Sequence, residues 1–147
     1  MDNTSYEAIK LENQLCFPLY AASREVIKQY HPYLSALDLT YTQYITMMVL
    51  WEEKKISVKE LGKKLFLDSG TLTPVLKALS QKGFIERHRN TEDERLVIVE
   101  ITAAGDALKE QAKDVPQKIA GCVKLDTNEA VQLYTLLYKM LETFKEE

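Results

Sequence analysis

The order of patterns in the middle of this chain constrains its fold more than any other feature. Ser57 and Glu60 have the spacing of a capping box, in which each side chain accepts a hydrogen bond from the other residue's backbone N–H at the start of a helix. We expect this helix to end near Leu65, where a brief connection follows. Asp68 and Ser69 come next, and either can cap a second helix. Two short helices joined in this way predict a helix-turn-helix.

The second helix is expected to run from about Gly70 to Gln81. Gly83 is expected to close it, because glycine readily adopts the left-handed conformation found after a helix end. The side chains expected to face inward are Val75, Leu76 and Leu79. Those left facing outward are Thr71, Thr73, Pro74 and Lys77. This polar outward face is therefore free to contact another molecule.

A pair of strands is predicted after the two helices. Residues 84–88 and the β-branched run 96–101 flank a polar and charged segment over 89–94, which is typical of a β-hairpin with a charged tip. A helix-turn-helix followed by a hairpin predicts a mainly α fold with a small β-hairpin wing, a winged helix-turn-helix.

Further helical patterns lie before this region. From Leu15 to Tyr30 apolar residues follow a helical spacing that Pro32 is expected to end. Pro18 limits the start, because proline is tolerated only in the first turn, so the helix either begins just before Pro18 or kinks there. Tyr41 to Trp51, after the possible cap Thr40, predicts a short apolar helix in the core.

Two more helices are predicted after the hairpin. Thr102 can cap a long helix toward Val115, and Asp126 or Thr127 can cap a final one. The apolar stripe of this final helix is Val131, Tyr134, Leu137, Leu141 and Phe144. That stripe needs a partner to cover it.

Composition limits the class of protein. The 147 residues, 46% of them hydrophobic, suffice for one ordinary domain. Charged residues break every apolar run well before the roughly 18 residues that a membrane span needs, and the polar N-terminus lacks the form of a signal peptide. We therefore expect a cytoplasmic protein with no membrane partner. In that compartment Cys16 and Cys122 are reduced by default, which argues against a permanent structural disulfide.

Charge is distributed unevenly along the chain. The net charge of −3 argues against nonspecific binding of nucleic acid. Between Ser57 and Arg95, however, there are eight Lys or Arg against six Asp or Glu, whereas residues 126–147 hold two against five. Any DNA-facing surface must therefore lie in the middle of the chain.

Three blocks of sequence carry a resemblance to a known family. They are LENQLCF with YAASRE around Cys16, LDSGTLTPVLKAL in the second helix of the helix-turn-helix, and EDERLV at the hairpin tip. With these blocks the chain resembles the MarR family of winged-helix repressors, and within it the organic hydroperoxide regulators called OhrR. The resemblance implies a homodimer that binds a near-palindromic operator in double-stranded DNA and represses transcription, including that of a thiol-dependent peroxidase. It also implies a helical dimerisation region over 1–33 and 114–147, around a DNA-binding domain over 34–113.

The expected DNA contacts follow from this fold. If the second helix enters the major groove, its hydroxyls and ammonium reach base edges or phosphates. In the family's wing, Arg95 enters a minor groove and Asp93 holds its guanidinium. The residues expected to contact DNA or to orient such contacts are Ser69, Thr71, Thr73, Lys77, Arg87, Arg89, Asp93 and Arg95. The alternative is that each of these charged side chains, other than that of Arg95, is an ordinary solvated surface group that does not contact DNA.

Cys16 is the expected sensor. A thiol reacts with peroxide as its thiolate, which a helix N-terminus favours. In the resembled regulators two tyrosines also hydrogen-bond the sulfur across the dimer, and the matching positions are Tyr30 and Tyr41. The apolar neighbours Leu15, Phe17 and Tyr20 favour organic hydroperoxides over hydrogen peroxide. At Pro18 the family more commonly has a larger apolar residue, which affects the approach to the sulfur.

Cys122 bears on the chemistry after oxidation. A sulfenic acid either waits for a small-molecule thiol or condenses with a second cysteine. In two-cysteine members of the family the resolving cysteine comes from the other subunit, and Cys122 is similarly placed in the sequence. The alternative is that Cys122 only fills space.

Three other functions are compatible with parts of the sequence. A MarR-type repressor released by a phenolic or other small ligand keeps the fold without the redox role. A cysteine peroxidase would use the same thiolate, but the chain shows no peroxidatic motif, so we do not expect an enzyme or a cofactor. A metal sensor is disfavoured because His31 and His88 with two distant cysteines form no recognisable ligand set.

Overall fold

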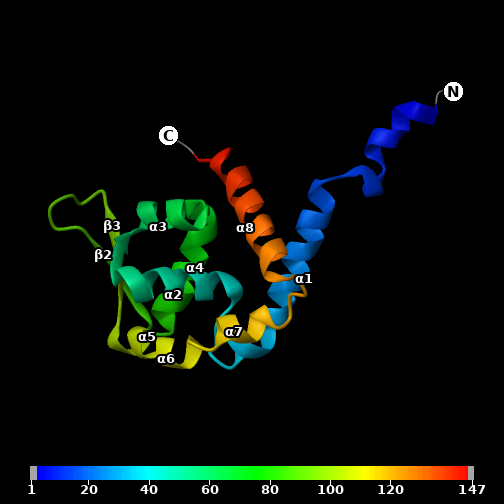
Figure 1. The fold of residues 1–147 in the computed structure, drawn as a ribbon. Helices are drawn as coiled ribbons and strands as arrows, with labels where there is room; N and C mark the ends of the chain where they lie inside the picture. Colours follow the sequence, from blue (N-terminus) through cyan, green and yellow to red (C-terminus); the bar gives the residue numbers. More distant parts are fainter. Residues whose placement is uncertain (1–2, 146–147) are drawn as a thin grey trace.

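The computed structural model describes residues 3–145 and consists of a winged body from which long helices extend (Figure 1). The elements in chain order are the 3-10 helices η1 (Asn3–Ile9) and η2 (Leu11–Asn13), then α1 (Cys16–Ser35), α2 (Tyr41–Glu53), β1 (Lys55–Ser57), α3 (Val58–Leu65), α4 (Ser69–Gln81), β2 (Ile85–Arg89), β3 (Val97–Ile101), α5 (Ala103–Ala107), α6 (Lys109–Ala112), α7 (Val115–Ala120) and α8 (Thr127–Glu142). The expected mainly α fold with a small hairpin is confirmed.

The sheet of the winged body has the strand order β1-β3-β2, with both pairs antiparallel. The hairpin β2–β3 is the expected wing. Strand β1 was not expected, because a segment of only 3 residues is too short to show an alternating pattern. It pairs with the base of β3, where Ile56 lies opposite Val99, and so joins the wing to the start of α3.

One hydrophobic core holds the winged body together. Leu76 and Leu79 from α4 pack against residues of α2, α3 and the sheet, which confirms the prediction that these two side chains face inward. Among the largest fully buried side chains are Met47, Leu50, Leu61, Leu72, Ile85 and Val99. Because α4 packs through this one face, its opposite face is left exposed to solvent.

Helix α1 is longer than the sequence predicted. It begins at Cys16, so Pro18 lies in the first turn, as one of the two alternatives required. The expectation that Pro32 ends the helix is wrong, because the helix continues to Ser35. Pro32 removes one backbone hydrogen bond, but Leu34 in the last turn packs into the core, where its side chain is only 2% exposed. The chain turns at Asp38, whose φ is 56°.

The long helix expected from Thr102 toward Val115 is instead divided into α5 and α6, and α7 begins where that helix was expected to end. Thr102 does cap the first of them, since its hydroxyl accepts a hydrogen bond from the backbone N–H of Gly105 at 3.1 Å. Pro116 accounts for the later break. In a continuous helix its ring would clash with the preceding turn, whereas a new start places it in the first turn of α7.

The caps of the other helices agree with the sequence, with one correction. The boxes at Thr40 with Gln43 and at Asp126 with Glu129 are reciprocal. At α3 the Ser57 hydroxyl accepts from the Glu60 backbone N–H at 3.1 Å. The Glu60 side chain does not make the return bond of a capping box, and its carboxylate lies 3.6 Å from Lys63 Nζ. The prediction of a full capping box was therefore wrong at this helix.

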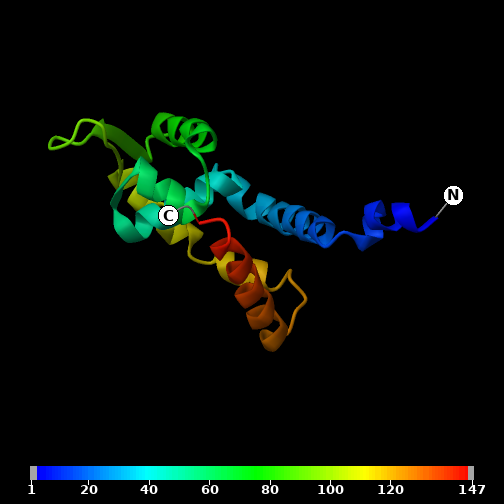
Figure 2. The ribbon, with the colours of Figure 1, turned by 90° about the horizontal axis from the view of Figure 1, so that it is seen from above.

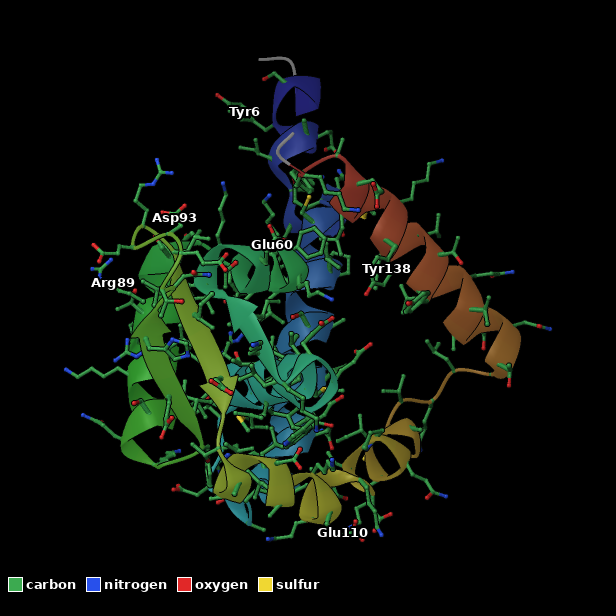
Figure 3. The ribbon with its side chains drawn as sticks, turned by 90° about the vertical axis from the view of Figure 1, so that its left-hand side faces the viewer. Tyr6, Glu60, Arg89, Asp93, Glu110 and Tyr138 are labelled. Atoms are coloured by element: carbon green, nitrogen blue, oxygen red, sulfur yellow. The ribbon has the colours of Figure 1, made fainter. Side chains whose placement is uncertain are left out.

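Helices α1 and α8 extend away from the core in different directions (Figure 2). Within α8 as described, all side chains are exposed or half-buried, and Tyr134 and Phe144 of the predicted stripe are 64% and 69% exposed. Figure 3 shows Tyr138 on α8 and Tyr6 on the N-terminal segment, both outside the winged body. None of the helices in the described part of the chain is both long and apolar enough to cross a lipid bilayer.

Candidate nucleic-acid interface and redox site

The exposed face of α4 carries the polar residues expected to contact DNA. Asp68, the N-cap, accepts a hydrogen bond from the Thr71 backbone N–H at 2.7 Å. The Thr73 hydroxyl donates to the Ser69 carbonyl oxygen at 2.7 Å, which leaves its lone pairs available. Ser69, Thr71, Thr73 and Lys77 are all exposed. These four side chains are thus exposed along α4, from Ser69 in its first turn to Lys77 in its second half.

The cap of this helix makes its stability depend on pH. Hydrogen bonds from the Thr71 backbone N–H, and then from its hydroxyl, hold the pKa of Asp68 below the ordinary carboxyl range. A carboxyl with a lowered pKa in the folded state stabilises that state above its unfolded pKa, and the stabilisation is lost as pH falls through the folded pKa.

We expect Asp68→Asn to remove this pH dependence while keeping the cap, because asparagine caps helices about as well as aspartate. The measurement is urea unfolding of both proteins from pH 7 to pH 3. The stability advantage of the wild type over the variant should shrink as pH falls. A difference that stays constant across this range would contradict the role of the Asp68 charge.

The wing tip carries an arginine whose guanidinium is held in place by a neighbouring aspartate. Asp93 accepts from Arg95 at both carboxylate oxygens, with Oδ1 3.1 Å from Nε and Oδ2 3.3 Å from Nη2. These bonds, with one from the Arg95 backbone, lower the pKa of Asp93. The Arg95 side chain is nevertheless 90% exposed. It therefore has a defined orientation at the wing tip and is open to a partner.

The wing loop has supports that the sequence analysis missed. Asn90 Oδ1 accepts from the backbone N–H of Glu92 at 2.7 Å and of Asp93 at 3.2 Å. Asparagine often closes turns in this way, and that was the available signal. Arg89 donates from Nη1 to the Glu94 carbonyl oxygen at 2.8 Å, which ties the two sides of the loop together; Figure 3 shows Arg89 and Asp93 at the wing. Arg87 is exposed on β2.

Cys16 is exposed at the first residue of α1. The two expected tyrosines lie far from it in the same chain. Tyr30 is 14 residues further along this helix, a rise of about 21 Å. Tyr41 packs against Tyr30, with ring centroids 5.0 Å apart. The structure thus brings the tyrosines together and leaves Cys16 at the opposite end of the helix.

The tyrosine pair is suited to donating hydrogen bonds. Burial raises the pKa of Tyr30 and of Tyr41, and Tyr44 beside them is raised for the same reason. Each phenol therefore keeps its proton at neutral pH. The pair borders a pocket of about 650 Å³ between α1, the start of α2 and the end of α4. An anionic sulfur entering this pocket would meet phenol O–H groups in a lining that combines apolar side chains with the charged side chains of Lys28, Asp38 and Lys82.

Cys122 is exposed just after α7, and its thiol donates to the Lys118 carbonyl oxygen at 3.5 Å. Helix α7 packs against the C-terminal half of α1, where the Lys118 ammonium lies 5.3 Å from the Tyr33 ring centroid. Cys122 therefore lies near the end of α1 that carries Tyr30 and Tyr33, and not near the end that carries Cys16.

The fold and the exposed polar face of α4 define a winged-helix transcriptional regulator. A family model described as transcriptional regulator SarA/Rot matches residues 28–112, so the chain belongs to this family of regulators. The resemblance to the MarR-type hydroperoxide regulators is also confirmed. An organic hydroperoxide resistance transcriptional regulator of Bacillus subtilis is 48% identical over the whole chain and 99% of its own length.

Two staphylococcal relatives extend the comparison. The HTH-type transcriptional regulator SarZ of Staphylococcus aureus is 42% identical over 82% of this chain and 81% of its own. AbfR of Staphylococcus epidermidis has been solved in several states. The reduced protein bound to DNA has a TM-score of 0.77 and 33% identity, covering 95% of this chain and 96% of its own. An overoxidised form is also bound to DNA, and a further structure contains the disulfide. These relatives are regulators rather than enzymes.

Proposed function

We propose that this chain is a homodimeric, cytoplasmic repressor that binds a near-palindromic operator and releases it when organic hydroperoxides oxidise Cys16. The observation that carries the proposal is the distance between Cys16, at the start of α1, and the half-buried pair formed by Tyr30 near the end of α1 and Tyr41 of α2. A second copy of the chain can bring its cysteine to this pair, which one chain alone cannot do. The 48% identity to a hydroperoxide resistance regulator supports the same function.

The pattern of α1 supports antiparallel pairing between two copies. Cys16, Tyr20, Ser23, Ile27 and Tyr30 follow a spacing of four, three, four and three residues, which places them on one face as in a coiled coil. Tyr20 is 59% exposed and Ile27 38% exposed, so this face is open in one chain. Ser23 is the midpoint between Cys16 and Tyr30. A two-fold axis at Ser23, beside two alanines, would let the helices approach closely and place each Cys16 against the other subunit's Tyr30.

The same pairing supports a disulfide between subunits. Because α7 packs on the tyrosine end of α1, an antiparallel partner would bring its Cys16 toward Cys122, which follows α7. We propose residues 1–33 and 114–147 as the dimerisation region, which includes the exposed α8, and residues 34–113 as the DNA-binding domain.

The proposed DNA contacts follow from the exposed surface of the winged body. Helix α4 would enter the major groove with Ser69, Thr71, Thr73 and Lys77, and each wing would place Arg95 in the minor groove. Arg87 would add a phosphate contact. Arg89, already bonded to the wing loop, would act chiefly by holding the loop that presents Arg95.

The proposed signal chemistry has two steps. The Cys16 thiolate attacks the outer oxygen of the hydroperoxide, the O–O bond breaks, and the sulfur becomes a sulfenic acid while an alcohol leaves after protonation. The Cys122 thiolate of the other subunit then attacks this sulfur, forming the disulfide and releasing water once the hydroxide is protonated. A disulfide requires the Cα atoms to approach within about 7 Å, so it would displace the end of α1 and reorient the winged domains.

Cys122→Ser is expected to remain on DNA after peroxide treatment, although its Cys16 is still oxidised. The reason is that overoxidised AbfR is bound to DNA, so in that relative oxidation of sulfur is compatible with binding. The measurement is operator affinity with and without cumene hydroperoxide, together with non-reducing electrophoresis. Release of DNA by the oxidised variant, in the absence of small thiols, would show that Cys122 is not needed.

Fluorescence anisotropy tests the proposed function. Reduced protein is titrated onto labelled DNA from upstream of its own gene, before and after one equivalent of cumene hydroperoxide, at fixed salt because phosphate contacts make affinity salt-dependent. The proposal requires tight binding, loss with peroxide and recovery with dithiothreitol. Tight binding that ignores peroxide would contradict it and favour a repressor released by a small ligand.

A further inference from the structure

A half-buried lysine connects the end of helix α4 to the turn that precedes helix α2. Lys82, the C-cap of α4, has a side chain only 24% exposed. Its Nζ donates to the Asp38 backbone carbonyl oxygen and to Gln43 Oε1, the latter at 3.0 Å. The Asp38 carboxylate lies 3.7 Å from the same nitrogen but is itself 84% exposed. The two inward contacts therefore hold the lysine more firmly than the exposed charge pair does.

Gln43 connects this lysine with the start of α2. Its side-chain oxygen accepts both from Lys82 and from the Thr40 backbone N–H, the latter at 3.1 Å. The amide is 8% exposed. Tyr41 is the first residue of α2 and follows directly after Thr40. A displacement of Tyr41 therefore changes the geometry of the bond that Gln43 makes with Lys82.

The same residues line the tyrosine pocket. Tyr30, Tyr41, Asp38 and Lys82 all border the cavity of about 650 Å³ between α1, α2 and the end of α4. Lys82 is thus in contact with the proposed cysteine-binding pocket on one side and with the helix proposed to read DNA on the other. It lies at the end of α4 away from Thr71 and Thr73, so its ammonium is not directed at the expected DNA contacts.

We propose that Lys82 is a positioning residue that couples the Tyr30–Tyr41 pocket to the orientation of α4. This proposal rests on the proposed peroxide response. When oxidation moves Cys16 of the partner out of the pocket, the turn bearing Tyr41 shifts, and the bonds from Lys82 to Asp38 and Gln43 carry the shift to α4. Contacts to two acceptors, one in the turn before α2 and one in its first turn, make this connection more effective than a single surface ion pair, which contributes little.

The test measures the ratio of operator affinity in the reduced and the peroxide-treated protein. In Lys82→Met this ratio is expected to fall by about 2- to 30-fold relative to the wild type, the range found when residues that link two sites are replaced. Lys82→Arg should keep the wild-type ratio, because a guanidinium can also donate to both oxygens. Lys113→Met is the matched control, since it removes the same charge from the end of α6, which neither lines the tyrosine pocket nor belongs to α4.

Asp38→Gly gives a second control. Glycine suits the positive φ at this position and keeps the carbonyl that Lys82 contacts, so the ratio should fall less in this variant than in Lys82→Met. If Lys82→Met does not fold, Lys82→Gln is used in the same comparison, because its shorter amide cannot reach both acceptors. A wild-type ratio in the Met or Gln variant would overturn the coupling role while leaving the peroxide response intact. A wild type that does not respond to peroxide would overturn the proposed function and the coupling together.

Discussion

Arg95→Ala is expected to weaken operator binding by roughly 30-fold or more. A side chain that makes a specific DNA contact contributes about 1–3 kcal/mol, and a dimer loses this contact at both wings. At about 1.4 kcal/mol per tenfold change, a combined loss of about 2 kcal/mol already reaches this value. The orientation of the guanidinium supports the size of the effect, because Asp93 fixes it before DNA arrives while leaving it 90% exposed.

Asp93→Asn tests the positioning of Arg95 separately from its contact with DNA. The amide keeps one acceptor and loses the charge, so we expect a smaller decrease in affinity than in Arg95→Ala. Lys113→Ala controls for the loss of one positive charge. All four proteins are compared by anisotropy at one salt concentration. Wild-type affinity in Arg95→Ala would mean that the wing does not enter the DNA.

Cys16→Ser is expected to abolish the response to peroxide without weakening the binding of reduced protein to DNA. Coupling between two sites in a protein typically changes affinity by about 5- to 150-fold, which is the release we expect for the wild type. The variant should show no release, because a serine hydroxyl forms neither a sulfenic acid nor a disulfide. Cys16 is exposed at the start of α1 within its own chain and serine is close to it in size, so we expect this variant to fold as the wild type does.

Cys122→Ser serves as the paired comparison for this variant. It retains the sulfur that reacts with peroxide and lacks only the proposed second partner. Mass spectrometry should therefore find oxidised Cys16 in Cys122→Ser, and neither variant should form a disulfide-linked dimer. If Cys16→Ser still leaves the operator after peroxide, the signal acts elsewhere and a ligand-binding repressor becomes the better account.

Much of the winged body could be predicted because local signals there agree with the packing. The caps at Thr40, Asp68 and Asp126 and the closing Gly83 each set an element boundary through one or two hydrogen bonds or a backbone conformation. Pro32 shows where this reasoning fails. A proline predicts a helix end from local energy alone, but Leu34 in the core offsets the lost bond. That contact is between distant residues and leaves no pattern in the local sequence.

The candidate site could be predicted residue by residue but not as an arrangement. Motifs indicated Arg95 and Asp93, and their contact follows from adjacency in one loop. The bonds of Lys82 to Asp38 and Gln43 join residues about 40 positions apart and follow no periodicity, so sequence reasoning missed them. The separation of Cys16 from Tyr30 became informative only when the helix was seen to be continuous from Cys16 to Ser35.

The central claim is that oxidation of Cys16 controls DNA binding, and one titration tests it most directly. Operator-bound wild-type protein receives increasing amounts of cumene hydroperoxide, and each sample is divided between anisotropy and mass spectrometry of the peptide that contains Cys16. The fraction of DNA released should equal the fraction of Cys16 joined to Cys122, and dithiothreitol should reverse both. Release while Cys16 remains a free thiol, or retention of DNA when the disulfide is complete, would contradict it.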